Sequence, residues 1–177
     1  LMLAASPAQS VAVVPPTSEP RAEKVSREFA QIVAKKLGIE PKRVTRGFLT
    51  GLQTLYLSST QVTDAGLAHL QDLTGLQKLY LGDTHVTDAG LAHLHGLTRL
   101  QWLSLWNTKV TDAGLAHLQG LTWLQWLDLG DTRVTDAGIA HLKGLNGLQW
   151  LSLRNTRVTD TGLAHLKRAL RHCTVVK

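Results

Sequence analysis

The sequence lacks the features that mark several common classes of protein. Its single cysteine, Cys173, excludes a framework of intramolecular disulfides. No apolar run approaches the roughly 18 residues that a membrane-spanning helix needs. The glycines form no phosphate-cradling loop, and no spacing specifies a Ser-His-Asp triad. With no motif specific for a reaction, we expect a protein that is not an enzyme.

Positive charge is also scarce where the sequence is most regular, although the whole chain carries a formal net charge of +6. Residues 1–48 hold eight Lys/Arg and four Asp/Glu, whereas residues 49–177 hold eleven and nine. A nucleic-acid site needs basic residues aligned without competing carboxylates. The near balance in the longer part argues against nucleic acid as a partner.

The dominant feature of the chain is a unit of 24 residues that recurs five times from residue 49 onward. It reads L-Q-x-L-x-L-x-x-T-x-V-T-D-A-G-L-A-H-L-x-x-L-T-x. Leucines and aspartates mark the period: Leu52, Leu76, Leu100, Leu124 and Leu148; Asp64, Asp88, Asp112, Asp136 and Asp160. A unit this short cannot bury its own leucines, whereas stacked neighbours enclose a continuous core. The period therefore predicts a solenoid.

Each unit combines a strand, a turn and a short helix. Alternating apolar residues, as in 103–106, are typical of a half-buried strand. Leu115 and Leu118 then follow at helical spacing, with Thr111 or Asp112 placed as the N-cap. We assign the recurring aspartates to helix capping, and an acid in the first turn also suits the helix dipole.

The units resemble leucine-rich repeats. L-x-x-L-x-L is the pattern of that family, and V-T-D-A-G-L-A-H-L is similar to a bacterial 24-residue class related to GALA repeats. The resemblance implies an α/β fold, a right-handed solenoid with parallel strands on the concave face and short helices on the convex face. It also implies a protein or peptide partner, because such repeats most often bind proteins.

This chain departs from the family after the strand, where the family usually has asparagine. Threonine stands there in every unit: Thr60, Thr84, Thr108, Thr132 and Thr156. A hydroxyl offers one hydrogen-bond donor where an amide offers two. We therefore expect a less complete ladder of hydrogen bonds between repeats.

The ends of the chain differ from the repeats, and we divide the sequence at residues 1–20, 21–48 and 49–177. The first segment opens with small and apolar residues, and Ser6 and Ala8 have cleavage-like spacing, as at the end of a signal peptide. We expect a secreted or periplasmic protein. A disordered leader on a cytoplasmic protein is the alternative.

Residues 21–48 are interpreted as an N-terminal cap. Apolar residues with helical spacing predict an amphipathic helix that stops near Gly38 and Pro41: Val25, Phe29, Ile32, Val33 and Leu37. A docking helix is the alternative, because the other face is basic. The solenoid of residues 49–177 should end in a last helix and a closing strand at 167–176, with Cys173 as a packing residue.

The outward strand positions vary between units, whereas the helical halves hardly change. Parallel strands lie about 4.8 Å apart, so tryptophans at 102, 126 and 150 should form a stripe roughly 10 Å long. Large surface aromatics beside polar groups favour ligand contact. We predict a binding site made of Trp102, Trp126, Trp150, Trp106, Tyr80, Tyr56, Asp128, Asn107, Asp131 and Arg154.

The function expected is a non-enzymatic module that binds a protein or peptide on this aromatic face. A carbohydrate or cell-wall ligand is one alternative. Another is a structural or self-assembling module, because stacked tryptophans on neighbouring strands also stabilise a sheet by themselves.

No cofactor or metal is expected. The five histidines that recur with the units each lie on a different helix, and helices are roughly 10 Å across, too far apart to share a zinc ion. Asp128 and Asp131 could form a carboxylate pair for acid–base work, but nothing marks a pocket around them, because a shallow concave sheet is generally open to solvent.

Overall fold

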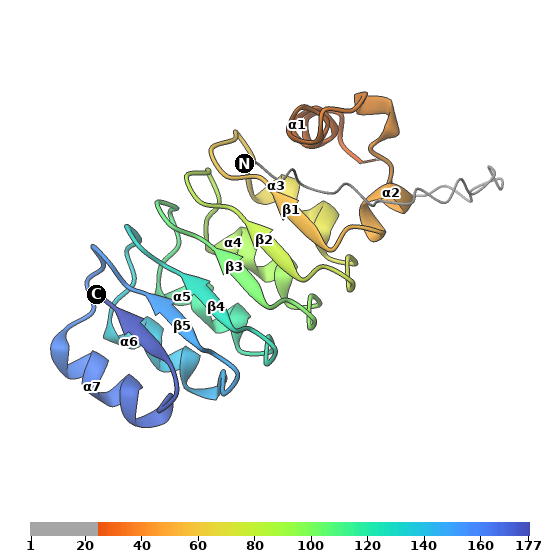
Figure 1. Cartoon of the computed structure of the whole chain (residues 1–177). Helices are drawn as coiled ribbons and strands as arrows, with labels where there is room; N and C mark the ends of the chain where they lie inside the picture. Colours follow the sequence, from red (N-terminus) through yellow and green to blue (C-terminus); the bar gives the residue numbers. More distant parts are fainter. Residues whose placement is uncertain (1–24) are drawn as a thin grey trace, which may run out of the picture.

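The structure is a computed structural model that describes residues 25–177, so the leader expected at residues 1–20 lies outside the described part. Its centre is one parallel sheet of six strands, whose spatial order is their order along the chain. The strands are β1 (Thr54–Tyr56), β2 (Lys78–Tyr80), β3 (Trp102–Ser104), β4 (Trp126–Asp128), β5 (Trp150–Ser152) and β6 (Thr174–Val176). From β1 to β5 the leucine at the centre of each strand pairs with the leucine of the next. The predicted α/β solenoid is confirmed, and Figure 1 shows its strands side by side along the molecule.

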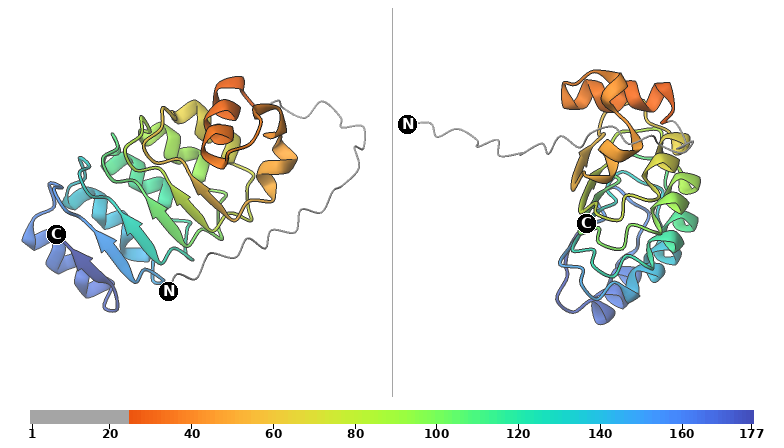
Figure 2. Two further views of the ribbon diagram at one scale, coloured as in Figure 1. Left: turned by 45° about the horizontal axis from the view of Figure 1, so that its top comes forward. Right: turned by 90° about the vertical axis from the view of Figure 1, so that its right-hand side faces the viewer.

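A short helix follows each of the first four strands on the opposite side of the solenoid. The helices are α3 (Asp64–Leu67) with η2 (Ala68–Leu70), α4 (Asp88–Leu91) with η3 (Ala92–Leu94), α5 (Asp112–Leu115) with η4 (Ala116–Leu118), and α6 (Asp136–Ile139) with η5 (Ala140–Gly144). Each is one α-helical turn that continues as a 3-10 turn. Residues three apart eclipse one another in a 3-10 helix, and Leu115 and Leu118 are both fully buried. Figure 2 shows the strands along the concave side and these helices along the convex side.

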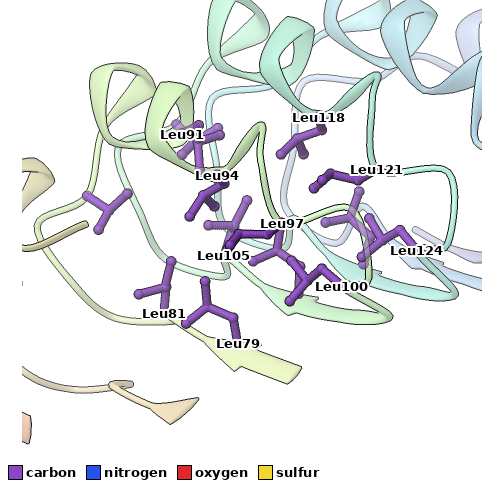
Figure 3. Packing of buried hydrophobic residues seen from close by; sticks show 14 of the residues in the cluster. Leu79, Leu81, Leu91, Leu94, Leu97, Leu100, Leu105, Leu118, Leu121 and Leu124 are labelled. Carbon is purple, nitrogen blue, oxygen red and sulfur yellow. The ribbon is translucent and has the colours of Figure 1, made fainter. Parts of the chain in front are cut away.

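The leucines form one continuous core between the sheet and the helices. Figure 3 shows leucines of neighbouring units in this core, among them Leu79 and Leu81 next to β2 and Leu118 below its helix. All three are fully buried. A fully buried leucine contributes roughly 1.5–3 kcal/mol, and in a solenoid that burial is completed by the neighbouring repeat. The stability of each unit therefore depends on stacking.

The recurring aspartates do not cap their own helices, so that prediction is wrong. The threonine before each aspartate is the N-cap, and the aspartate carboxylate reaches back to the N-cap threonine of the following repeat. Asp88 accepts a hydrogen bond from Thr111 N at 2.7 Å and from Thr111 Oγ1 at 2.6 Å. Asp112 binds Thr135 in the same way, at 2.7 and 2.6 Å. We call this pair of bonds, also formed by Asp64 and Asp136, the aspartate–threonine link.

The glycine of each T-D-A-G motif is explained by the same link. A Cβ atom on Gly114 would overlap the Asp88 carboxylate, and one on Gly138 would overlap that of Asp112. Glycine thus leaves the space into which the preceding aspartate fits. Gly66 belongs to the first repeat, so no aspartate from a preceding repeat reaches it. The ring of Phe29 from the N-terminal helix lies there instead.

The threonines after the strands bond within their own repeat. Thr108 Oγ1 donates to Leu105 O at 2.6 Å, and the other four threonines make the equivalent bond. The one donor of each hydroxyl is used within its own repeat, so these side chains add no hydrogen bond between repeats. This agrees with the less complete ladder expected from threonine in place of asparagine. Backbone bonds such as Lys109 N to Val86 O, together with the aspartate–threonine link, join neighbouring units.

The N-terminal end of the solenoid is covered by helices. They are α1 (Arg27–Leu37), η1 (Pro41–Arg43) and α2 (Arg46–Thr50). As predicted, α1 ends at Gly38, which adopts the left-handed conformation with a φ of 65°. Its face with Phe29 and Val33 is buried, and Lys36 donates from its exposed side to Ser58 O at 2.7 Å. These contacts favour the interpretation of α1 as a cap over the first repeat.

The C-terminal end is closed by α7 (Asp160–Ala169) and by β6, which pairs with β5 in parallel. No threonine of residues 25–177 bonds the carboxylate of Asp160, and Lys177 Nζ bonds it at 2.6 Å instead. This contact lowers the pKa of Asp160. Cys173 packs against the core, and partial burial raises the pKa of its thiol to about 11. Little thiolate therefore exists near neutral pH, as suits a packing residue.

Replacing an aspartate of the link should destabilise the protein only where a following repeat exists. We expect Asp112→Ala to lower the free energy of unfolding by about 2 kcal/mol, because two charge-assisted bonds to Thr135 are lost. Asp160→Ala is the matched control and should cost much less, since it removes only an exposed contact with Lys177. Urea unfolding followed by circular dichroism measures both. Equal losses would contradict the role of the link.

The glycine and the aspartate of successive repeats should be coupled. Alanine normally favours a helix over glycine by about 1 kcal/mol, yet Gly114→Ala should destabilise, because the added Cβ displaces the Asp88 carboxylate from Thr111. In the Asp88→Ala background the same change should be neutral or stabilising. A double-mutant cycle in urea gives the coupling, and additive losses would show that the two residues act independently.

Candidate functional site

A ladder of aromatic rings crosses the concave sheet. The rings of Trp102 and Trp126 stack with centroids 4.2 Å apart, and those of Trp126 and Trp150 with centroids 4.4 Å apart. This is the predicted stripe. It does not stop at the third repeat, however. Tyr80 lies 6.2 Å from Trp102 and stacks on Tyr56 at 4.5 Å, so aromatic rings run continuously from β1 to β5.

Stacking determines which ring surfaces a ligand can reach. Trp126 is parallel to Trp102 within 13° and to Trp150 within 2°, so both of its faces are covered. The Nε1 of Trp102 is fully buried and is the only such side-chain nitrogen or oxygen between residues 25 and 177 without a hydrogen-bond partner. In the first repeats, burial and the neighbouring Tyr56 raise the pKa of the Tyr80 phenol. Most of the ladder therefore packs against itself, and its central tryptophan offers edges rather than faces.

Trp106 lies apart from the ladder and is 39% exposed. It occupies the third outward position of its repeat, where the chain has Ser58, Gly82, Trp106, Gly130 and Arg154 in successive units. Its indole ring covers Gly82, because a Cβ atom at that glycine would overlap the ring. Glycine in the preceding repeat thus gives Trp106 its place on the sheet.

A hollow of about 330 Å³ opens on the other side of Trp106. Its lining residues are Trp106, Asp128, Gly130, Asp131, Trp150, Ser152 and Arg154. Gly130 is buried between the large residues of the neighbouring repeats and has no side chain to fill the space. A Cβ there would lie 3.2 Å from Asp128 Oδ1 and 3.4 Å from Ser152 Oγ, so both polar groups lie beside the empty position.

The hollow brings together five of the ten residues predicted for the site. Trp106, Trp150, Asp128, Asp131 and Arg154 line it, whereas Trp102, Trp126, Tyr80, Tyr56 and Asn107 do not. The sequence analysis missed Gly130 and Ser152. The alternation of glycine with large residues at the third outward position was the signal that could have found Gly130. The hollow itself was not predicted, because the strand pattern of an open sheet gives no reason to expect one.

The polar residues of the turns have a structural reason for their identity. Ser59, Asp83, Asn107, Asp131 and Asn155 all have a φ between 51° and 57°, in the left-handed region that asparagine and aspartate tolerate well. Asn107 Nδ2 donates to Asp83 Oδ1 at 2.8 Å, and Asn155 Nδ2 donates to Asp131 Oδ1 at 2.9 Å. Each aspartate of these pairs keeps its second oxygen free of side-chain bonds.

The recurring histidines do not form a shared site. His69 packs against Phe29 and accepts a bond from Ser26 N, while His141 bonds Gln119. Within residues 25–177 no three His, Cys, Asp or Glu side chains are grouped closely enough to hold a metal ion. None of the helices in this part has the length and apolar character of a membrane span.

The parallel sheet, the buried leucines and the aromatic ladder that crosses the sheet define a repeat solenoid with one concave surface of varied side chains. The family model for the leucine-rich repeat matches residues 50–110 and 98–158. This chain belongs to the leucine-rich-repeat family. Members of that family are generally modules of protein–protein interaction.

Solved structures of bacterial leucine-rich-repeat proteins share the fold. An internalin of Listeria monocytogenes is 20% identical with a TM-score of 0.51, and the match covers 84% of this chain and 54% of the internalin. A leucine-rich-repeat protein of Leptospira interrogans is 20% identical with a TM-score of 0.56, covering 73% of this chain and 38% of that one. This chain thus spans about half of the internalin or less than half of the Leptospira protein. No curated protein matches the sequence.

The aromatic ladder should contribute to stability through its stacked faces. We expect Trp126→Ala to lower the free energy of unfolding by about 2 kcal/mol, because two stacked pairs are lost. It should also abolish the exciton signal that stacked indoles give in far-ultraviolet circular dichroism. Trp106→Ala is the control, since that ring is outside the ladder, and it should leave the exciton signal unchanged. A retained signal in Trp126→Ala would contradict the stacking.

Proposed function

We propose that this chain is a non-enzymatic recognition module that binds a protein or peptide segment on its concave face, with Trp106 and the hollow over Gly130 at the centre. The observation that carries the proposal is the hollow itself. The helical halves of the five repeats are nearly identical, and among the varied outward positions only Gly130 lies between a large aromatic and a large cationic residue. A volume of about 330 Å³ falls at the lower end of binding pockets, which span roughly 300–1,000 Å³.

The arrangement around the hollow has the character of an interaction hot spot. Such spots are enriched in tryptophan and arginine and are ringed by polar groups. The ring of Trp106 lies against Gly82 and keeps 39% of its surface exposed, so a partner can contact it directly. Trp150 ends the stacked ladder and also lines the hollow. The ladder supports this wall, and the remaining predicted site residues, Trp102, Trp126, Tyr80, Tyr56 and Asn107, extend the contact surface around it.

Catalysis is the weaker interpretation of the same residues. Asp128 Oδ1 accepts from Gly130 N at 3.0 Å, and Asp131 Oδ1 is bonded by Asn155, so both carboxylates are oriented by hydrogen bonds. Ser152 is the one hydroxyl among the lining residues, and it makes no hydrogen bond to Asp128 or Asp131, so no carboxylate is in place to activate it as a nucleophile. A secreted or periplasmic location, suggested by the leader pattern alone, forms part of the proposal and would give the module an extracytoplasmic partner.

Peptide display tests the proposed site with a library of sequences in place of a single candidate partner. Clones are selected from a random-peptide library on the immobilised full chain, and their affinities are compared between the wild type and two variants. Trp106→Ala should weaken binding by about thirtyfold, the effect of losing a hot-spot residue. Trp123→Ala is the matched control, because that tryptophan is 63% exposed but lies in the loop before β4, outside the hollow.

Three other results would count against the proposed function, the first by moving the site and the other two by changing the kind of partner. Loss of binding in Trp123→Ala alone would move recognition to another surface. Enrichment only from a glycan panel, again dependent on Trp106, would make the ligand a carbohydrate. Concentration-dependent mass in sedimentation, abolished by Trp106→Ala, would make the face an assembly surface.

A further inference from the structure

We infer that the hollow over Gly130 receives a cationic side chain, a guanidinium or an ammonium group, from the bound segment. The inference rests on the proposed function and names the chemistry of the group that this site recognises. It follows from three features of the lining: unpaired carboxylate oxygens, aromatic walls and a serine hydroxyl that has no partner at the edge of the space.

The carboxylates of the hollow are oriented but not neutralised. Asp128 uses Oδ1 to accept from Gly130 N, and Asp131 uses Oδ1 to accept from Asn155 Nδ2. Neither forms an ion pair with Arg154 or with another cation of residues 25–177. An ionised carboxylate has about four acceptor positions, so both residues retain oxygens for a donor that carries positive charge.

Arg154 also lines the hollow and makes no hydrogen bond to either aspartate. It is exposed, and its long side chain is free to extend into solvent. With one arginine and two aspartates, the lining carries a formal net charge of −1. The balance of fixed charge at the lining therefore favours a cation over an anion.

Two aromatic side chains add to this preference. Trp106 and Trp150 both line the hollow. The face of an indole ring attracts cations, and arginine or lysine within about 6 Å of a tryptophan centroid gains roughly 0.5–2 kcal/mol. Trp150 stacks on the ladder, and the ring of Trp106 lies against Gly82.

Ser152 supplies the observation that is independent of charge. The residue is only 4% exposed, yet its hydroxyl has no hydrogen-bond partner within residues 25–177. It lies 3.4 Å from the position where Gly130 lacks a side chain, so it borders the empty space. Trp102 Nε1 is the only fully buried side-chain nitrogen or oxygen of residues 25–177 without a partner, so the Ser152 oxygen still reaches the open space of the hollow, where a bound N–H donor would bond it together with Asp128.

Short capped peptides provide a probe that does not depend on the natural partner. Acetylated and amidated Gly-Arg-Gly, Gly-Lys-Gly, Gly-Leu-Gly and Gly-Glu-Gly are titrated into the ¹⁵N-labelled full chain, and the indole N–H signals are followed by NMR. We expect Gly-Arg-Gly and Gly-Lys-Gly to shift the Trp106 and Trp150 signals with a Kd of about 1 mM. Binding should weaken as salt is added. The neutral and acidic peptides should leave both signals unchanged.

A pair of matched variants locates the charge. Asp131→Asn removes a carboxylate from the hollow, whereas Asp83→Asn removes one outside it that accepts the same kind of amide bond. We expect about fivefold weaker binding of Gly-Arg-Gly to Asp131→Asn and no change for Asp83→Asn. Gly130→Leu should abolish binding by filling the space. If Gly130→Leu does not fold, the two aspartate variants still decide the question.

The inference is overturned if Gly-Glu-Gly or Gly-Leu-Gly binds as well as Gly-Arg-Gly, if no peptide shifts the Trp106 signal, or if Asp131→Asn and Asp83→Asn behave alike. These failures are distinct from failure of the proposed function. Displayed peptides that need Trp106 but contain no cationic residue would leave recognition standing and refute the cation site. Gly-Arg-Gly bound in the hollow, with no displayed peptide dependent on Trp106, would support the cation site and count against the proposed function.

Discussion

Each repeat of this solenoid is held to the next by a carboxylate that bonds the N-cap threonine of its neighbour. Asp88 bonds both the backbone nitrogen and the hydroxyl of Thr111, and the glycine two residues after Asp112 leaves room for that carboxylate. The link joins successive helices while the leucines pack beneath it, and it recurs between neighbouring repeats from Asp64 to Thr159. On the other side of the core the strands of the same repeats pair in one parallel register.

In the first and the fifth repeat, other residues take the place of one partner of the aspartate–threonine link. Phe29 of the N-terminal helix lies over Gly66, where no preceding aspartate exists, so an aromatic ring covers both the glycine and the leucines behind it. At the other end Lys177 bonds the carboxylate of Asp160. Phe29 and Lys177 thus occupy, at these two positions, the places that an aspartate and a threonine of a neighbouring repeat take elsewhere.

A frame fixed from its convex side leaves the concave side free to vary. Tryptophan, aspartate, glycine and arginine replace one another there without changing the leucines or the links beneath them. Among these replacements, glycine changes the shape of the concave face most. At Gly82 it seats the ring of Trp106, and at Gly130 the same absence of a side chain leaves a hollow with Asp128 and Ser152 beside it.

The sequence by itself determined the period, the strand and helix order, the buried leucines and the position of the aromatic stripe, because each follows from residue spacing within one unit. It did not determine which atoms meet between units. Asp112 and Thr135 are 23 residues apart, and only stacking brings the Thr135 nitrogen within 2.7 Å of the Asp112 carboxylate. Spacing within one unit therefore predicts capping of the aspartate's own helix, whereas the aspartate bonds the next repeat. The covered faces of Trp126 and the hollow over Gly130 likewise depend on side chains from three consecutive repeats. The tertiary structure decided these features, because residues about 24 positions apart come into contact only when the repeats stack.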